Sequence, residues 1–274
     1  MVKSNFVQVE DVKTHYLESG SGEDMILLHG GLPGVPTSCE DWEFNIDPLS
    51  KHFHVYSLDQ RGFGLTDVPP TDCTHTARIK HVVQFMDTVG IKSAHLVGHS
   101  MGAYISEVIA LDQPEKVKRL IIIATGSGAP LGVYDEYGKL APALARSHSF
   151  DPSRARESAR EILKGGIYNN ELVTDSWIDR WSKRYLNYPS LNEESRKQMP
   201  FPPPPLIDRP SQIKNPTLII WGRQDESSFV SRGLKLFELI PGAQMHIFDK
   251  AGHFVFVDQT KAFNRLLITF CGGE

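Results

Sequence analysis

The sequence predicts an α/β protein in which a mostly parallel central sheet carries helices on both faces and a helical cap is inserted into the chain. Short, continuous apolar runs have the pattern of strands buried on both faces. Segments with helical spacing of their apolar residues alternate with these runs. The alternation stops between about residues 126 and 210 and then resumes, which indicates an insertion. The predicted buried strands are 25–28, 53–58, 94–97, 120–124, 217–221 and 245–248.

Residues 1–129 are expected to form the first part of the core. Residues 6–9 and 14–17 alternate loosely around a turn at Glu10 and Asp11, which predicts a β-hairpin. Residues 41–49 predict a short helix. From Thr76 the apolar residues recur at helical spacing, and Gly90 is well placed to end that helix.

Residues 130–210 are expected to form the cap, and residues 211–274 to complete the core. Asp151 followed by Pro152 is a typical helix start and predicts a charged helix to Lys164. Further cap helices are expected over 177–186 and 191–199. Because proline lacks an N–H and has a fixed φ, the prolines of 200–205 predict an extended tether. The core then carries helices near 230–240 and 262–270.

The composition excludes several classes of protein. The formal net charge is −4 over 274 residues and no basic stripe is present, which argues against partners such as nucleic acid or an anionic membrane. No apolar run is long enough to span a bilayer, and no signal-peptide pattern opens the chain. The widely spaced Cys39, Cys73 and Cys271 suggest free thiols rather than a disulfide framework or a metal site. We expect a cytoplasmic protein without a metal or cofactor. The sequence allows a homo-oligomer but does not decide the oligomeric state.

The most informative stretch is Gly98-His99-Ser100-Met101-Gly102, which lies between a predicted strand and a predicted helix. This spacing predicts a nucleophile elbow, a sharp turn that lifts a serine hydroxyl above the sheet edge. Small residues are needed two positions before and after Ser100 because the strand and helix come close there. The turn also directs the N–H of Met101 at the place where an acyl oxygen becomes negative.

A serine nucleophile needs a base and a group that orients the base. Asp225 follows the strand 217–221, and His253 follows the strand 245–248 in a loop that contains glycine. Because ligand chemistry in parallel sheets gathers at the carboxyl ends of strands, we expect these two residues to complete a triad with Ser100. Asp59 also follows a predicted strand, but not the strand that usually carries the triad acid. The remaining acids near the histidine, Asp249 and Asp258, are interpreted as solvated loop residues.

A second donor for the oxyanion is expected from the loop 29–34. Its glycines let a backbone N–H come opposite that of Met101, and Gly31 is the preferred donor, with Leu32 as the other choice. His29 is expected to be structural and to bond this loop. A phosphate loop is excluded because no Gly-Lys-Ser/Thr ending follows.

Taken together, the motifs resemble the α/β-hydrolase superfamily over nearly the whole chain. They are H-G-G at 29–31, D-Q-R-G-F-G at 59–64, G-H-S-M-G at 98–102, W-G-R-Q-D at 221–225 and A-G-H at 251–253. A narrower resemblance is to the meta-cleavage product hydrolases, which split C–C bonds in ring-fission products of aromatic compounds. The loop 30–34, the segment 45–49 and the region from 221 to 248 are similar to theirs.

The narrower resemblance implies a cap arginine that binds the substrate carboxylate, and Arg184 falls in the matching region. We expect Arg184 to face Ser100 if the protein is a C–C hydrolase and to face solvent if it is not. His99 and Phe254 stand where that family usually has asparagine and tryptophan. Both are expected to line the substrate pocket with Leu32.

The expected activity is metal-free hydrolysis of a small organic substrate by attack of a serine on a carbonyl carbon, with C–C cleavage as the narrower hypothesis. A carboxylesterase or lactonase is the alternative, since G-H-S-M-G suits those enzymes equally well. A receptor that keeps the hydrolase fold is a third hypothesis, against which the intact Ser100, Asp225 and His253 argue.

Overall fold

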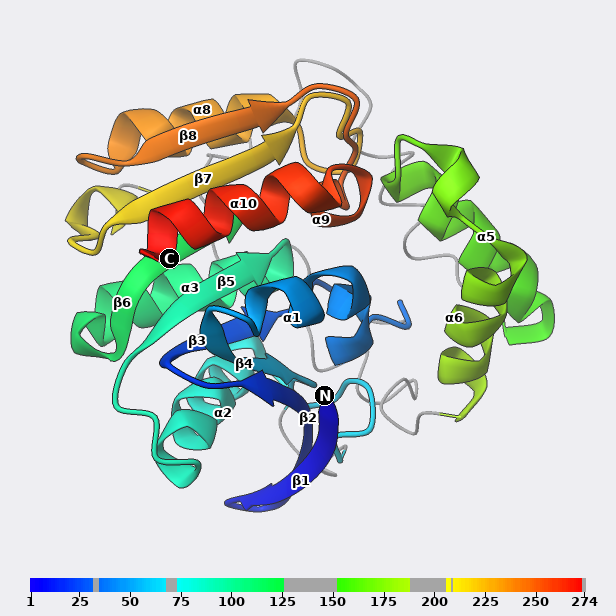
Figure 1. Ribbon diagram of the computed structural model, residues 1–274, viewed down its shortest axis with the longest axis horizontal. Helices are drawn as coiled ribbons and strands as arrows, with labels where there is room; N and C mark the ends of the chain where they lie inside the picture. Colours follow the sequence, from blue (N-terminus) through cyan, green and yellow to red (C-terminus); the bar gives the residue numbers. More distant parts are fainter. Residues whose placement is uncertain (32–34, 68–72, 126–151, 188–205, 208, 273–274) are drawn as a thin grey trace.

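The structure, a computed structural model, describes residues 1–31, 35–67, 73–125, 152–187, 206–207 and 209–272. Its centre is an eight-stranded sheet in the order β1-β2-β4-β3-β5-β6-β7-β8 (Figure 1). The strands are β1 (Lys3–Val9), β2 (Val12–Gly20), β3 (Glu23–Leu28), β4 (Phe53–Leu58), β5 (Ala94–His99), β6 (Val117–Ile123), β7 (Thr217–Gly222) and β8 (Gln244–Phe248).

The sheet is antiparallel at one edge and parallel elsewhere. The hairpin β1–β2 pairs antiparallel to β4, while the strands from β4 to β8 run parallel to one another. Every residue of β5 and β7 is buried, as expected for strands covered on both faces. In register, Leu28 lies beside Gly98 and Ile123 beside His99, so the ends of β3, β5 and β6 meet at one edge.

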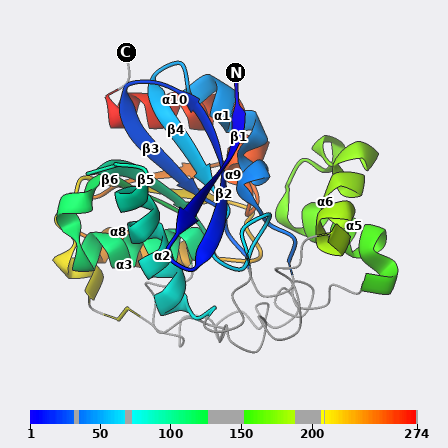
Figure 2. The same ribbon diagram turned by 90° about the horizontal axis from the view of Figure 1, so that it is seen from below.

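Helices cover both faces of the sheet (Figure 2). On one face, α1 (Glu43–Leu49) packs against α10 (Thr260–Cys271), and the amide of Asn45 donates to Asn264 Oδ1 at 2.8 Å. On the other face lie α2 (His75–Thr88), α3 (Met101–Asp112) and α8 (Val230–Leu239). This arrangement confirms the predicted α/β class with helices on both faces.

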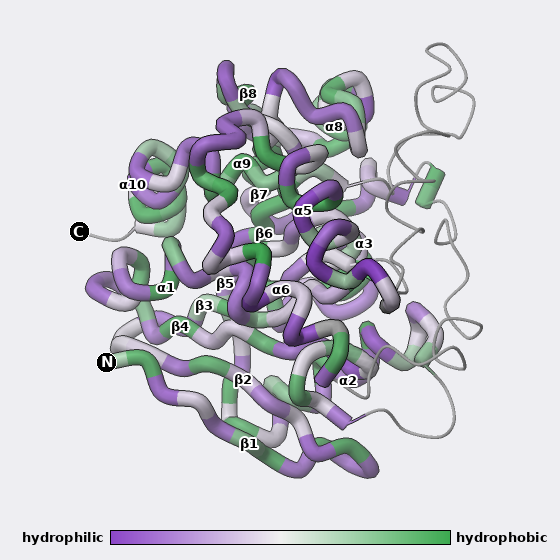
Figure 3. The backbone as a smooth tube through the Cα atoms, turned by 90° about the vertical axis from the view of Figure 1, so that its right-hand side faces the viewer, coloured by the Kyte–Doolittle hydropathy of each residue, from purple (hydrophilic) through white to green (hydrophobic). Residues whose placement is uncertain are grey.

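Two helices of the insertion, α5 (Ala155–Gly166) and α6 (Asp175–Asn187), lie beyond the carboxyl ends of the parallel strands (Figure 1). Long hydrophilic stretches run along both helices in the view of Figure 3. Trp177, Ile178 and Trp181 are buried, so α6 packs through an apolar face. These two helices match the first and second helices expected in the cap.

Most predicted elements are present with small differences. Strand β6 begins at Val117, three residues before the predicted run, because pairing with Ala94 extends the ladder past the charged Lys118. The last predicted helix is preceded by a separate short helix, α9 (Val255–Asp258). The expected helix 191–199, the whole proline tether 200–205, Asp151 and the expected boundary at residue 130 lie outside the described residues, so the domain division stays a prediction. No described helix has the length and apolarity needed to cross a bilayer.

Adding one methyl group at Gly98 tests the packing of β5 against α3. A Cβ there would lie 2.4 Å from Gly102 O and 2.5 Å from Ala103 Cα, so backbone must shift. We expect Gly98→Ala to lower the free energy of unfolding by about 1–3 kcal/mol. In the control Gly165→Ala the new Cβ meets no atom within 4 Å, and losing a helical glycine should raise stability by roughly 0.5–1 kcal/mol. Equal melting temperatures for the two variants would contradict this packing.

Candidate active site

Ser100 lies at the sharp turn between β5 and α3. Its backbone has φ 53° and ψ −113°, a left-handed conformation that a serine adopts only when its surroundings impose it. A Cβ at Gly102 would lie 2.3 Å from Leu28 O, which shows how closely α3 approaches the end of β3. Met101 is the first residue of α3, so its N–H lies at the positive end of that helix. This is the geometry expected of a nucleophile elbow.

Asp225 and His253 form a hydrogen-bonded pair at the ends of the neighbouring strands β7 and β8. His253 Nδ1 lies 2.8 Å from Asp225 Oδ2. Asp225 Oδ1 accepts the N–H groups of Ser227 and Ser228, both at 2.8 Å, which fixes the orientation of the buried carboxylate. An acceptor at Nδ1 leaves Nε2 free to exchange protons. The structure therefore joins the predicted acid to the predicted base.

His99, the residue before Ser100, connects the elbow to His253. Its Nε2 lies 3.1 Å from the carbonyl oxygen of His253, and the two rings are 4.5 Å apart between centroids. Burial lowers the pKa of His99 well below its usual value, so its ring is neutral and donates to that carbonyl. Among the described residues, Ser100 Oγ makes no hydrogen bond to His253; such bonds often tighten only when substrate binds.

The glycine loop after β3 lies against the nucleophile. A Cβ at Gly30 would be 3.1 Å from the Cβ of Ser100. Gly31 has φ +132°, and a Cβ there would be 2.5 Å from Thr37 Oγ1, so only glycine suits this close approach. His29 Nδ1 bonds Gly30 O at 2.5 Å, and burial lowers the pKa of His29 to about 4. The structural role expected for His29 is thus observed, while Leu32 lies outside the described residues.

Phe254 lies between the core and the cap. It is buried, its ring contacts Trp181 of α6 at 6.2 Å between centroids, and its N–H donates to Gly166 O at the end of α5. A Cβ at Gly166 would lie 2.6 Å from the Phe254 ring. The residue that follows His253 is therefore packed directly against both cap helices.

Arg184 adopts neither of the two positions that we expected from the sequence as alternatives. It does not face solvent, because its side chain is 4% exposed. Nor is it a free cation beside Ser100, because Nη1 lies 2.8 Å from Asp41 Oδ1 and Nε lies 2.6 Å from Glu40 Oε2. Both acids belong to the turn η1 (Cys39–Trp42), so this cluster joins cap helix α6 to the core.

Burial raises the pKa of Asp41 to about 7, although Arg184 and the Ser38 N–H both favour its charged form. Glu40 and Asp41 were not predicted from the sequence as partners of Arg184. The spacing Ser38-x-x-Asp41 is that of a helix N-cap, and both capping bonds are present, so the local pattern around Asp41 gives no sign of its contact with α6.

Three buried residues outside this site, His15, Cys39 and Asp59, have ligand atoms within 4.8 Å of one another. Asp59 already accepts bonds from His15 Nδ1 at 2.7 Å and from the N–H groups of Cys39 and Leu65. Burial raises the pKa of the Cys39 thiol, which disfavours the thiolate that a metal requires. The trio therefore satisfies its own polar groups, and all three cysteines are free, as expected.

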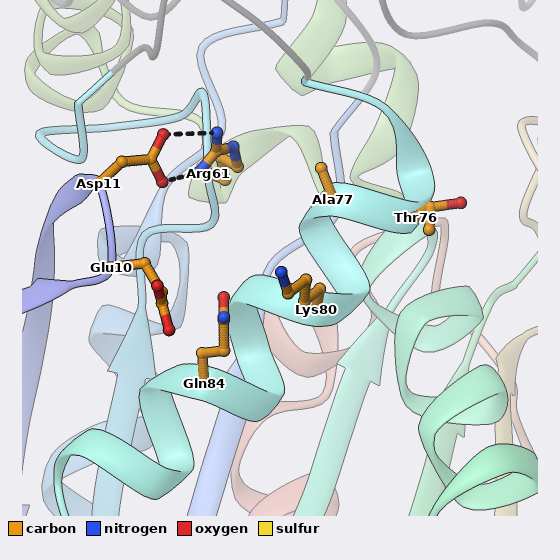
Figure 4. A pocket seen from close by; sticks show the side chains of 7 residues that line it. All are labelled: Glu10, Asp11, Arg61, Thr76, Ala77, Lys80 and Gln84. Carbon is orange, nitrogen blue, oxygen red and sulfur yellow. Dashed lines mark hydrogen bonds and ion pairs between the residues drawn. The ribbon is translucent and has the colours of Figure 1, made fainter.

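A surface pocket of about 300 Å³ lies between the β1–β2 turn and α2 (Figure 4). Its most buried cation, Arg61, makes two bonds to Asp11 at 3.0 and 3.1 Å. None of the proposed catalytic residues lines it. Its described lining is Glu10, Asp11, Arg61, Thr76, Ala77, Lys80 and Gln84.

Comparison with known proteins agrees with this geometry. A family model for the alpha/beta hydrolase fold matches residues 24–260. The chain belongs to the α/β-hydrolase family. This hydrolase is 30% identical over 269 residues to a 2-hydroxy-6-oxononadienedioate/2-hydroxy-6-oxononatrienedioate hydrolase from Burkholderia vietnamiensis, covering 95% of this chain and 91% of that protein. It is also 30% identical to a 2-hydroxy-6-oxo-6-phenylhexa-2,4-dienoate hydrolase from Burkholderia cepacia, covering 97% and 96% of the two chains.

Solved structures of other α/β hydrolases superpose well on this one. A variant of the meta-cleavage product hydrolase CumD has a TM-score of 0.86 at 31% identity, covering 98% of this chain and 97% of CumD. Est816, described as an N-acyl homoserine lactone degrading enzyme, has a TM-score of 0.77 at 25% identity, covering 97% and 100% of the two chains.

The orienting role of Asp225 can be tested with a substitution that keeps the size and shape of its side chain. Asp225→Asn replaces the acceptor of the Nδ1 proton by an amide and favours the wrong tautomer of His253. We expect kcat to fall by about 10³ to 10⁴, by analogy with the same change in a serine protease, while the melting temperature stays close to that of the wild type. A loss of kcat below tenfold would exclude Asp225 as the triad acid.

The buried Asp41 should make stability depend on pH. Its pKa is raised in the folded state, so its stabilising contribution is complete below about pH 4 and is lost as the pH rises towards 7. Asp41→Asn cannot ionise. We therefore expect its melting temperature, relative to the wild type, to rise between pH 4 and 7. The exposed Asp47→Asn is the control for the loss of one acidic side chain. A difference in melting temperature between Asp41→Asn and the wild type that stays constant from pH 4 to 7 would contradict the effect of burial on Asp41.

Proposed function

We propose that this α/β hydrolase cleaves a C–C bond in a meta-cleavage type of ring-fission product, with Ser100 as nucleophile, His253 as base and Asp225 as the orienting acid. The observation that carries the proposal is the 2.8 Å pair of His253 and Asp225 beside the strained Ser100 turn. The C–C hydrolase names of the relatives, which match this chain over nearly its full length, support the choice of substrate class.

In the proposed mechanism Ser100 Oγ attacks the ketone carbonyl carbon while His253 Nε2 takes the hydroxyl proton. The N–H groups of Met101 and Gly31 stabilise the oxyanion, a contribution that preorganised donors supply without rearrangement. Collapse of the adduct breaks the C–C bond, and His253 returns the proton to the leaving carbon. Water then releases the acyl group from Ser100 by the same sequence of proton transfers.

Substrate binding is assigned to His99, Phe254 and Arg184, with Leu32 completing the proposed pocket. A substrate carboxylate that binds Arg184 must compete with Glu40 and Asp41 for the guanidinium. The raised pKa of Asp41 favours this exchange, since a proton taken up by Asp41 releases part of the positive charge for the substrate.

A carboxylesterase or lactonase is the second candidate. It is favoured by one specific observation, namely that the charge of Arg184 is already balanced by two carboxylates, which suits a neutral substrate. The likeness to the lactone-degrading Est816 supports the same choice. We also propose a cytoplasmic location, in keeping with three buried free thiols; the proposal of a homo-oligomer stays open.

The test compares an acidic dienol ketone, 2-hydroxy-6-oxo-6-phenylhexa-2,4-dienoate, with the neutral ester p-nitrophenyl butyrate. We expect the wild type to have the larger kcat/KM for the ketone and to release benzoate. Ser100→Ala should lose at least about 10³-fold of kcat on both substrates. Turnover of the ester alone would establish the second candidate, and activity that survives in Ser100→Ala would exclude both.

Arg184→Ala should cost about 2–5 kcal/mol in kcat/KM for the acidic ketone and little for the ester. Arg180 is the matched control, because it lies one turn earlier on α6 and pairs with the core acid Glu43 at 2.8 Å while remaining 45% exposed. Arg180→Ala should leave the preference between the substrates unchanged. Asp41→Asn should lower the KM of the acidic ketone, since one competitor for Arg184 loses its charge. Equal losses on both substrates in Arg184→Ala would contradict a carboxylate-binding role.

A further inference from the structure

The loop that carries His253 has its backbone groups held by partners from several elements. The N–H of Ala251 donates to the side-chain Oε1 of Gln224, and the main-chain N–H of Gln224 donates to Ala251 O. The Phe254 N–H donates to Gly166 O in the cap. The N–H of Gly252, the group next to His253, donates to Asp258 Oδ2 at 2.8 Å.

Asp258 binds two separate segments of the chain. Besides Gly252, its Oδ2 accepts the N–H of Tyr168 at 3.0 Å, and its Oδ1 accepts the N–H of Asn169 at 2.9 Å. Tyr168 and Asn169 follow cap helix α5, whereas Gly252 belongs to the core. One half-buried carboxylate at the end of α9 therefore accepts three main-chain N–H groups, two from the cap and one beside the base.

The two segments touch without side chains between them. A Cβ at Gly252 would lie 2.6 Å from Gly166 O and 3.2 Å from the backbone nitrogen of Tyr168. Only an acceptor with two oxygens can bind three N–H groups in so narrow a space. An asparagine would turn its NH₂ group towards one of these donors and leave that bond unmade.

We propose that Asp258 is a positioning residue for His253, which fixes the histidine loop and the cap segment 166–169 as one unit. The inference rests on the proposed role of His253 as base. Asp258 acts through Gly252 and touches no reacting atom, so its loss should displace the imidazole rather than remove a substrate contact. The effect should therefore appear in kcat and not in KM.

The expected loss follows from the sensitivity of catalysis to geometry. A displacement of about 1 Å can cost about 10²-fold in rate. We expect Asp258→Asn to lower kcat about tenfold to a hundredfold at unchanged KM, and Asp258→Glu, which keeps both oxygens, to recover most of that loss. Amide hydrogen exchange at Tyr168 and Asn169 should be faster in Asp258→Asn than in the wild type.

The matched control is Asp249→Asn. Asp249 precedes His253 by four residues, as Asp258 follows it by five, and its side chain is 60% exposed and bonds Gln224 Nε2. The N–H groups of Ala251, Gly252 and Phe254 all donate to acceptors other than Asp249. The kcat of Asp249→Asn and its exchange at residues 168–169 should therefore match the wild type. All variants are assayed on whichever substrate the wild type turns over faster, with melting temperatures recorded for each.

The outcomes separate the inference from the proposed function. If wild-type turnover does not depend on Ser100, the proposed function fails. If it does and Asp258→Asn behaves like Asp249→Asn, the positioning role is overturned. The role is also overturned if Asp258→Asn raises KM at unchanged kcat. It is overturned as well if kcat and melting temperature fall together in Asp258→Asn and fall equally in Asp258→Glu. A selective loss of kcat with faster exchange in the cap, recovered by Asp258→Glu, supports it.

Discussion

The close approach of β3, β5 and α3 is the constraint on which the candidate site depends. With no side chains at Gly98 and Gly102, the backbone can turn within a few residues, and Ser100 is held in a left-handed conformation at the turn. Parallel pairing then brings the ends of β7 and β8 to the same edge of the sheet. The acid and the histidine reach the elbow because the strands that carry them share its direction.

The cap is joined to this edge by two polar contacts, one an ion-pair cluster and the other a set of hydrogen bonds from main-chain N–H groups to a carboxylate. In one, the buried guanidinium of Arg184 meets Glu40 and Asp41 of the core. In the other, the carboxylate of Asp258 accepts main-chain N–H groups from both sides. The first contact is the one with which a substrate carboxylate competes in the proposed binding mode, whereas the second lies beside the loop of His253. Cap and core therefore meet through polar groups as well as through Phe254 and Trp181.

Sequence reasoning succeeded where the signal is local. Apolar runs predicted the parallel strands, and the spacing around Ser100 predicted the elbow, because a buried strand or a tight turn restricts its own residues. The order along the chain also predicted that Asp225 and His253 would meet. In contrast, a contact between distant segments leaves no pattern in either segment.

Arg184 was singled out from the sequence, but its partners Glu40 and Asp41 lie more than 140 residues away in the chain. Asp258 was interpreted as a solvated loop residue since its partners are main-chain N–H groups, which any residue except proline provides. The structure corrects that interpretation, because the carboxylate accepts three of them.

The place of the insertion in the sheet has a consequence for biosynthesis. Strands β6 and β7 are neighbours, yet residues 124–216, which include helices α5 and α6, are translated between them. When the first six strands have left the ribosome, β6 presents an uncovered row of main-chain donors and acceptors on an apolar strand, a surface prone to pair with other chains. Changes in the length or translation speed of the cap could therefore alter the yield of folded protein without altering any residue of the site.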